Sequence, residues 1–321
     1  MHSVLDEWRP VVDETIESLL PRTVDEAYLT ELFGEATYAY DPTAVQQALA
    51  DPIWDLLDRG GKRWRAVLFL LLVDAFGEAP ETYLEYATIP EVLHNGTIIV
   101  DDVEDGATHR RGSPALHHVH GTDVALNAGN AMYFLPLKVL ARDPGDLPAE
   151  RRLAAYEMLT HELNRTHLGQ GMDIRWHNDK EGRVSEAEYL EMCACKTVAF
   201  QIADDVLDVE HAMVAGGEFG KGAGNDVREG KKTLMVIHAA EHAEPSAVAR
   251  LEELLWAEEN TDDEVREAID ILETAGSVEY ARGVAEELAT SAKGHLEGLD
   301  LEPEPAAKLA GFADFVVQRE V

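Results

Sequence analysis

Basic residues and cysteines are both scarce in this chain. Its 321 residues include 27 Lys and Arg against 62 Asp and Glu, which gives a formal net charge of −35. Such a charge argues against nucleic acid or an anionic membrane surface as a partner. It is typical of a halophilic protein, kept dissolved in a very salty cytoplasm where ions screen the repulsion between its acids. An acidic interaction protein is the alternative.

The two cysteines, Cys193 and Cys195, are too close in sequence to face each other on a helix. They fit a reducing cytoplasm, and we expect them to be packing residues rather than a disulfide or a metal pair. No apolar run reaches the roughly eighteen residues of a transmembrane helix. The N-terminus also lacks the basic and then apolar pattern of a signal peptide. We therefore expect a soluble, cytoplasmic protein.

Strand-like alternation of apolar and polar residues is almost absent, and helical periodicity dominates the chain. Ser185 with Glu188, and Thr261 with Glu264, have the spacing of capping boxes at helix starts. No linker divides the chain, and the only repeat is a short acidic motif that occurs twice. The sequence predicts one all-α domain over residues 1–321, a large helix bundle.

The first acidic motif is DDVED, which begins at Asp101 and follows an apolar run. Residues four apart share a helix face, so Asp101 and Asp105 project together, with Asp102 alongside. Mg²⁺ is usually held by one or two carboxylates plus substrate phosphates. Arg110 and Arg111 follow, and guanidinium groups bind phosphate bidentately. This pattern indicates a metal-bridged phosphate site; a solvated acidic helix end is the alternative.

The second acidic motif, DDVLD, begins at Asp204 after another apolar run. Two such helices are what a cage of magnesium ions around a diphosphate would need. The scarce cations gather near these motifs, where we count 11 of the 27: Arg59, Lys62, Arg63, Arg65, Arg110, Arg111, Lys196, Lys221, Arg228, Lys231 and Lys232. An acidic chain that concentrates its cations in this way is expected to bind an anion there.

Together the motifs resemble the trans-isoprenyl diphosphate synthases, or polyprenyl synthetases, such as farnesyl and geranylgeranyl diphosphate synthases. The resemblance covers roughly residues 50 to 240. Its segments occur in the family's order: GGKRWR at 60–65, His94 with DDVED and RRG, GQGMD at 169–173, Lys196-Thr197, FQIADDVLD at 200–208, and GKGAGND with GKKT at 220–233. Each segment is modest alone, but the ordered set is highly specific.

The resemblance implies the fold and the reaction. The expected fold is a helix bundle of the isoprenoid synthase type with a central cavity. The expected reaction is a Mg²⁺-dependent prenyl transfer that joins isopentenyl diphosphate to an allylic diphosphate. It gives a longer all-trans polyprenyl diphosphate and pyrophosphate, with about three Mg²⁺ ions at the site. Family members are commonly dimers, so a homodimer is expected.

The resemblance also assigns roles to residues. The implied metal ligands are Asp101, Asp102, Asp105, Asp204, Asp205 and Asp208. The implied contacts to isopentenyl diphosphate are Gly61, Lys62, Arg65, His94 and Arg111. The positions matching allylic-substrate contacts are Arg110, Gln170, Lys196, Thr197 and Gln201, and two lysines that close over the diphosphate are Lys221 and Lys231. Charge on the leaving group would be stabilised by the metals with Arg110, Lys196 and Lys221, which makes these residues catalytic together with Asp101, Asp102, Asp105 and Asp204.

Two further matches and several structural alternatives stand beside these roles. Asp173 matches a position that supports the allylic substrate and metals, and Asp226 matches a polar position whose role is open. The glycines at 60–61 could form a plain turn, His94 could be a satisfied core residue, and the glycines at 169–171 could mark a helix kink. One cluster outside the matched positions suggests a metal site by composition alone: His117-His118-His120.

Product length in this family is expected to depend on residues just below the first motif. The fifth and fourth residues before Asp101 are Gly96 and Thr97, both small, where farnesyl-specific members often carry an aromatic floor. This predicts a product of C20 or longer. Tyr133 or Phe134 could form a floor from a neighbouring helix.

The chain departs from the family between Lys196 and Asp204, which are only eight residues apart. Roughly thirty or more residues are missing there, the length of two to three short helices, so one helical hairpin is expected to be shortened. The segment could be one continuous helix or reverse tightly near Val198-Ala199. The alternative function is therefore a truncated, non-enzymatic partner of a full-length synthase. An ionisation-dependent terpene cyclase is disfavoured, because it has no use for GGKRWR and Arg111.

Overall fold

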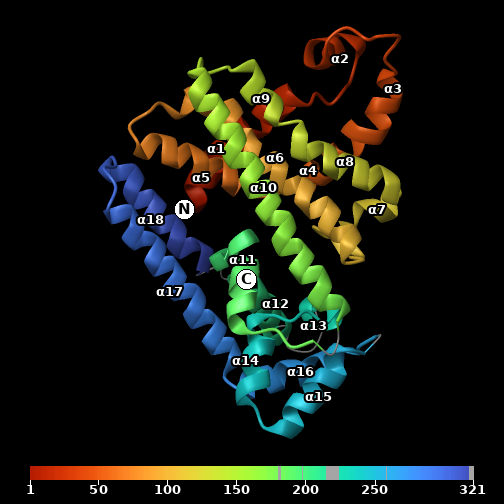
Figure 1. Ribbon diagram of the computed structural model, residues 1–321, viewed down its shortest axis with the longest axis vertical. Coiled ribbons are helices and arrows are strands. Elements are labelled where there is room, and N and C mark those ends of the chain that lie inside the picture. Colours follow the sequence, from red (N-terminus) through yellow and green to blue (C-terminus); the bar gives the residue numbers. More distant parts are fainter. Residues whose placement is uncertain (180–181, 197, 215–223, 258, 318–321) are drawn as a thin grey trace. The chain divides into compact units, whose positions relative to one another are not determined.

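The computed structural model describes residues 1–179, 182–196, 198–214, 224–257 and 259–317 (Figure 1). Helices make up 77% of it. Within these residues the only strands are β1 (His109–Arg110) and β2 (Ser113–Pro114), a short antiparallel pair. The predicted all-α fold is confirmed.

The chain forms two compact units. The first contains Met1–Met158 and Asp300–Leu309, and the second contains Leu159–Leu299 and Ala310–Val321. The single domain expected from the sequence stays a prediction.

The first unit is built around α6 (Leu84–Glu104), which carries the first acidic motif and packs against α1, α5 and α8. The other elements of this unit are α1 (His2–Leu19), α2 (Glu26–Phe33), α3 (Pro42–Val45), the π-helical turn η1 (Gln46–Ala50), α4 (Asp51–Asp58), α5 (Trp64–Ala75), the 3₁₀ turn η2 (Pro80–Tyr83), α7 (Leu116–Val119), α8 (Thr122–Phe134), α9 (Leu137–Arg142) and the start of α10 (Ala149–Asn178). The last helix, α18 (Pro303–Val317), begins in this unit.

Glycines allow α6 and α8 to cross very closely. A Cβ atom at Gly96 would lie 2.7 Å from the Cβ of Met132 and 2.8 Å from the carbonyl oxygen of Gly129. A Cβ at Gly129 would in turn lie 2.8 Å from Cγ2 of Val100. Real Cβ atoms do not approach so closely, so this crossing requires residues without side chains.

The second unit surrounds a core that includes Tyr189, Ile202, Leu234, Leu251 and Val265. Its elements are the end of α10, α11 (Glu186–Lys196), α12 (Val198–Val214), α13 (Asn225–Glu229), α14 (Leu234–His242), α15 (Pro245–Leu255), α16 (Asp262–Thr274), α17 (Ser277–Glu297) and the end of α18.

Both predicted capping boxes are present in this second unit. Glu188 accepts a hydrogen bond from the backbone N–H of Ser185, whose hydroxyl accepts from the N–H of Glu188. Thr261 and Glu264 make the same reciprocal pair at the start of α16. These local signals in the sequence therefore placed the starts of α11 and α16 correctly.

The shortened segment between Lys196 and Asp204 reverses direction. The Tyr189 hydroxyl on α11 donates a 2.5 Å hydrogen bond to Oδ2 of Asp205 on α12. Sixteen residues of one straight helix would hold these groups about 24 Å apart. The continuous helix is therefore wrong, and the tight reversal is the correct alternative. Thr197, between the two helices, lies outside the described residues.

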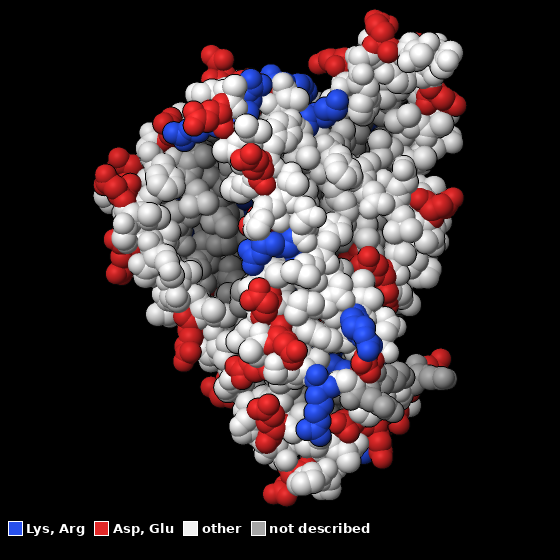
Figure 2. Space-filling view, in the orientation of Figure 1, with Lys and Arg blue, Asp and Glu red and all other residues white. Residues whose placement is uncertain are grey.

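The surface is strongly acidic, as the composition predicts. Figure 2 shows Asp and Glu side chains spread over the visible face, with fewer Lys and Arg among them. Within the described part of the chain, no helix has both the length and the apolar character needed to span a membrane.

Candidate active site

The first acidic motif divides its three aspartates between two kinds of environment. Asp101 and Asp105 lie at the C-terminal end of α6 and are partly exposed. Asp102 is 2% exposed, and its Oδ1 accepts hydrogen bonds from Nε and Nη2 of Arg110 at 2.8 and 2.5 Å. Burial raises the pKa of Asp102, and Arg110 partly offsets this rise. Asp102 therefore orients Arg110, while the two outer carboxylates lie nearer to solvent.

The residues assigned to isopentenyl diphosphate lie near one another in the first unit. Burial, followed by the charges of Arg65, Arg111 and Arg110, lowers the pKa of His94 well below its ordinary value. Burial also lowers the pKa of Arg111, and the charge of Arg110 contributes to that shift. These cations and the histidine are therefore close enough to influence one another, as a shared anion site requires.

The GGKRWR segment bends at its two glycines. Gly60 and Gly61 have φ values of 101° and 130°, a region that side chains other than glycine rarely adopt. Lys62 is exposed, and the guanidinium of Arg65 stacks over the Trp64 ring at 4.0 Å from its centre. The glycines thus bend the chain at the point where the two predicted phosphate ligands begin.

The second acidic motif repeats the division seen in the first. Asp204 is exposed, whereas Asp205 is 6% exposed and accepts hydrogen bonds from Tyr189 and from Nε2 of Gln201, the latter at 3.0 Å. Burial raises the pKa of Asp205 to about 7. The carboxylates of Asp204 and Asp208 lie one helical turn apart, and both are less buried than Asp205.

Asp208 faces a second cluster of acids in the same unit. It accepts backbone hydrogen bonds from Asn225 and Asp226 at 3.2 and 3.1 Å. Lys231 places its Nζ 2.8 Å from Glu229 and 3.6 Å from Asp226. Burial and the neighbouring carboxylates raise the pKa of Asp226 well above its usual value, although Lys231 opposes this. Among the described residues, carboxylates outnumber cations around Asp208, an excess of negative charge that suits a bound cation.

Lys196 is held in place by an ion pair. Its Nζ lies 2.7 Å from Oδ2 of Asp173 on α10. A Cβ at Gly169 would lie 2.9 Å from the Cβ of Cys195 and 3.0 Å from the carbonyl oxygen of Met192. The glycine of GQGMD therefore allows α10 and α11 to pack closely and to pair these two residues. Gln170 is partly exposed on the same helix.

The remaining assignments have different outcomes. Thr197 and Lys221 lie outside the described residues. In the histidine cluster, Nε2 of His120 lies 2.7 Å from Oδ2 of Asp55. Within the part of the chain that the structure describes, no set of three His, Cys, Asp or Glu side chains is arranged to hold a metal ion alone.

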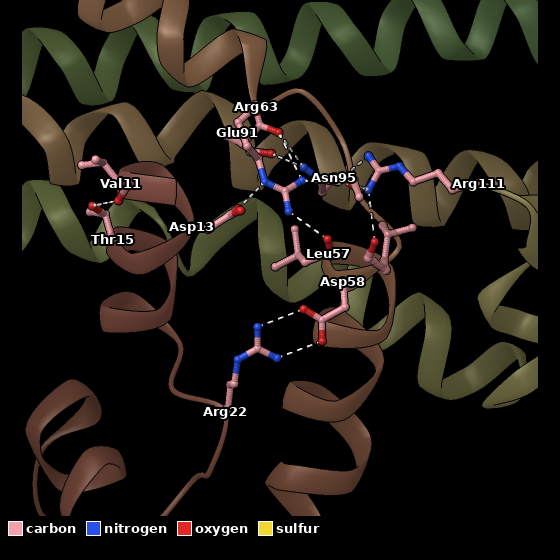
Figure 3. A network of polar contacts seen from close by, with 12 residues as sticks. Val11, Asp13, Thr15, Arg22, Leu57, Asp58, Arg63, Glu91, Asn95 and Arg111 are labelled. Carbon is pink, nitrogen blue, oxygen red and sulfur yellow. Dashed lines mark hydrogen bonds and ion pairs between the residues drawn. The ribbon is translucent and has the colours of Figure 1, made fainter. Parts of the chain in front are cut away.

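Sequence reasoning missed several residues that shape the site. Tyr189 holds Asp205, while Arg63, Glu91 and Asn95 form a buried polar network beside Arg111 (Figure 3). The sequence did carry a signal for this network, because Glu91 and Asn95 are polar residues in the run EVLHN on an otherwise apolar helix. A buried Glu and Asn at positions i and i+4 need partners.

Comparison with known proteins places this fold and site in one class. The family model described as polyprenyl synthetase matches residues 46–199 and 197–272. The geranylfarnesyl diphosphate synthase of Natronomonas pharaonis is 30% identical over 90% of this chain and 95% of its own. The solved geranylgeranyl pyrophosphate synthetase of Geoglobus acetivorans has 28% identity and a TM-score of 0.79, covering 98% of this chain and all of that one. The corresponding Pyrococcus horikoshii structure has 26% identity, a TM-score of 0.81, and coverage of 99% and 98%.

The fold is therefore the helical bundle of isoprenoid synthases. The chain belongs to the polyprenyl synthetase family, whose members are prenyltransferases.

The comparisons also bear on the shortened hairpin. The alignment with the Natronomonas pharaonis protein runs over 340 positions, more than the 321 residues of this chain. That relative therefore contains residues that have no counterpart here. The two matches to the family model meet at residues 197–199, next to the reversal between α11 and α12.

Proposed function

We propose that this protein is a Mg²⁺-dependent prenyltransferase. It joins isopentenyl diphosphate to an allylic diphosphate and releases pyrophosphate. The observation that carries the proposal is the shared design of the two acidic motifs. In each, two carboxylates four residues apart lie nearer to solvent, while the aspartate that directly follows the first of them is buried.

The outer carboxylates of both motifs are the proposed metal ligands, with about three Mg²⁺ ions around one diphosphate. Bound Mg²⁺ would stabilise negative charge on the departing diphosphate. Asp102 and Asp205 act differently, because both are buried. Asp102 aims Arg110 at the allylic diphosphate, and Asp205 links α12 to α11 through Tyr189.

The chain's own cations would bind and orient the substrates. Arg110 and Lys196, with Lys221 and Lys231, stabilise the allylic diphosphate as its C–O bond breaks and the electron pair leaves with pyrophosphate. The double bond of isopentenyl diphosphate then attacks the allylic cation, and a proton passes to the departing pyrophosphate. Further allylic-substrate contacts are assigned to Gln170, Thr197 and Gln201.

Isopentenyl diphosphate would be held in the first unit. Lys62, Arg65 and Arg111 supply positive charge, and the Gly61 backbone comes close to the phosphates. Because the pKa of His94 is lowered, its ring is neutral near pH 7 and donates one N–H to the diphosphate.

The proposed product is C20 or longer, and the structure changes the basis for that proposal. Gly96 is small because α8 crosses there, so its size says nothing about a cavity floor. Phe134 is 66% exposed, which disfavours it as the floor of an apolar cavity. Tyr133 is 7% exposed, and its Cδ1 would lie 3.4 Å from a Cβ at Gly96. Tyr133 therefore packs at the same helix crossing as Gly96, which leaves the small side chain of Thr97 as the basis for proposing a product of C20 or longer.

The shortened hairpin favours the alternative function, a non-enzymatic partner of a full-length synthase. The contacts within the hairpin favour an enzyme instead, because α11 and α12 pack into one core and Lys196 keeps an acidic partner. A terpene cyclase remains disfavoured, since it has no use for the isopentenyl-site cations Arg65 and Arg111, whose charges lower the pKa of His94.

The deciding experiment is a condensation assay. The purified protein is incubated in strong salt with Mg²⁺, isopentenyl diphosphate and each allylic diphosphate in turn. We expect an elongated prenyl diphosphate that Asp101→Ala abolishes, while Glu78→Ala, at an exposed acid of the same unit, retains it. A wild-type protein that makes no product but stimulates a full-length synthase would support the partner role instead.

We also propose that two copies of the chain associate through α10. Of its 30 residues only Gly169 is buried, and its Leu153, Met158 and Leu168 are each at least 58% exposed. Exposed apolar side chains of this size along one long helix indicate an interface with a second copy.

This homodimer can be tested by light scattering. Leu153→Glu combined with Met158→Glu should convert a dimer to a monomer in strong salt, because two charges would be buried without partners. Leu299→Glu, at an exposed apolar residue elsewhere, should leave the dimer intact. A wild-type protein that is monomeric at micromolar concentration would rule the interface out.

A further inference from the structure

Arg63 holds the GGKRWR segment from inside the protein. It is 4% exposed, so it cannot act as a substrate ligand like Lys62. Its Nη2 donates to the carbonyl oxygen of Leu57 at 2.8 Å and its Nη1 to that of Gly60 at 3.3 Å. Its Nε donates to Asp13 on α1 at 2.6 Å.

Arg111 also donates hydrogen bonds to the backbone at the start of this segment. Its Nη1 donates to the carbonyl oxygens of Leu56 and Gly60 at 3.1 and 2.7 Å, and its Nη2 donates to Oδ1 of Asn95 at 2.9 Å. A Cβ at Gly61 would lie 2.8 Å from Nη1 of Arg63 and 3.5 Å from Nη2 of Arg111. These bonds use three of the five N–H donors of Arg111, which leaves two for an anion.

Glu91 determines which way the Asn95 amide faces. Nδ2 of Asn95 donates to both the carbonyl oxygen and Oε1 of Glu91, at 2.8 and 3.2 Å. The amide oxygen must then point to Arg111, as Figure 3 shows. Asn95 is fully buried, and Glu91 is 4% exposed. Nη1 of Arg63 lies 3.9 Å from Oε1 of Glu91. Burying a carboxylate is costly unless it is paired and hydrogen-bonded, and here Asn95 and Arg63 are the partners of Glu91.

We propose that Glu91 and Asn95 are positioning residues for the isopentenyl diphosphate site. Neither touches the substrate. Glu91 fixes the Asn95 amide, Asn95 fixes the guanidinium of Arg111, and Arg63 with Asp13 fixes the loop that carries Lys62 and Arg65. The inference rests on the proposed function, because it takes the diphosphate of isopentenyl diphosphate as the ligand of Arg111.

The test compares Asn95→Ala and the milder Glu91→Gln with wild type. The control is Asn130→Ala, at an exposed asparagine of α8. Direct binding of isopentenyl diphosphate is measured by calorimetry, and KM for each substrate and kcat are measured by turnover. Thermal melts show that each variant is folded.

Losing the bond that orients Arg111 should raise the Kd and KM for isopentenyl diphosphate about 10-fold or more in Asn95→Ala. We expect about 3-fold or more in Glu91→Gln, with kcat and the allylic KM within about 2-fold in both variants. A purely structural role would lower the melting temperature and the active fraction while leaving KM unchanged.

An unchanged KM for isopentenyl diphosphate in both variants, with normal wild-type turnover, would overturn this inference and leave the proposed function standing. A wild-type protein that neither binds isopentenyl diphosphate nor turns it over would overturn both.

Discussion

At the scale of single residues, burial separates side chains that look equivalent in the sequence. Asp101 and Asp102 are neighbours in DDVED, but Asp101 is partly exposed, whereas Asp102 is buried, where it pairs with Arg110. Asp204 and Asp205 differ in the same way. The helix spacing predicted that the first and last aspartates of each motif share a face. It could not reveal that Arg110 and Tyr189 would occupy the middle ones, because those contacts depend on packing.

His94 gives a prediction about pH. Its folded pKa is lowered by burial and nearby arginines, so below about pH 6.5 the unfolded chain binds the proton more readily than the folded one. The free energy of unfolding should therefore fall as the pH is lowered through this range, by up to about 1.4 kcal/mol per pH unit from this group.

The measurement is denaturant unfolding of wild type and His94→Gln between pH 7 and 5. The variant should lose less stability on acidification, and His161→Gln, at an exposed histidine, should behave as wild type does. Identical pH dependence in wild type and His94→Gln would show that folding does not lower the pKa of His94.

At the scale of elements, two glycines explain why α6 lies where it does. Gly96→Ala would force a Cβ against Met132 and the Gly129 backbone. Such overpacking typically costs about 1–3 kcal/mol. We expect Gly96→Ala to lower the melting temperature and leave the product length unchanged.

Thr97→Ala is the matched control, since Thr97 is only partly buried and its hydroxyl bonds to the backbone of its own helix. Melting curves and chromatography of the prenyl products check both variants. A shorter product from a stable Gly96→Ala protein would show that residue 96 faces the substrate after all.

The sequence predicted the helical fold but did not decide the course of the chain between Lys196 and Asp204. Helical periodicity and two capping boxes identified the fold class and two helix starts correctly. Between Lys196 and Asp204 the sequence left two alternatives, because no Gly or Pro marks the reversal. Only the hydrogen bond between Tyr189 and Asp205 decides it, and that contact joins residues 16 positions apart.

At the scale of the whole molecule, the net charge of −35 predicts a dependence on salt. Raising the ionic strength from about 0.1 to 1 M shortens the screening length from about 10 to 3 Å, which weakens repulsion between surface acids. We expect the melting temperature to rise by about 5–10 °C over this range, equivalent to a few kcal/mol.

The salt is KCl, and sucrose at the same osmolality is the control that separates charge screening from solvent exclusion. Sucrose should raise the melting temperature less than KCl does. A melting temperature that does not depend on KCl would contradict the halophilic interpretation of the composition.

The central claim is that both acidic motifs act through Mg²⁺ on a single diphosphate. The most direct measurement is calorimetric binding of pyrophosphate, with and without Mg²⁺, to wild type, Asp101→Asn and Asp204→Asn. The account predicts one Mg²⁺-dependent pyrophosphate per chain, with affinity reduced about 10-fold or more by either substitution alone. Two independent Mg²⁺-dependent sites, or a loss of pyrophosphate affinity in only one of the two variants, would contradict this claim.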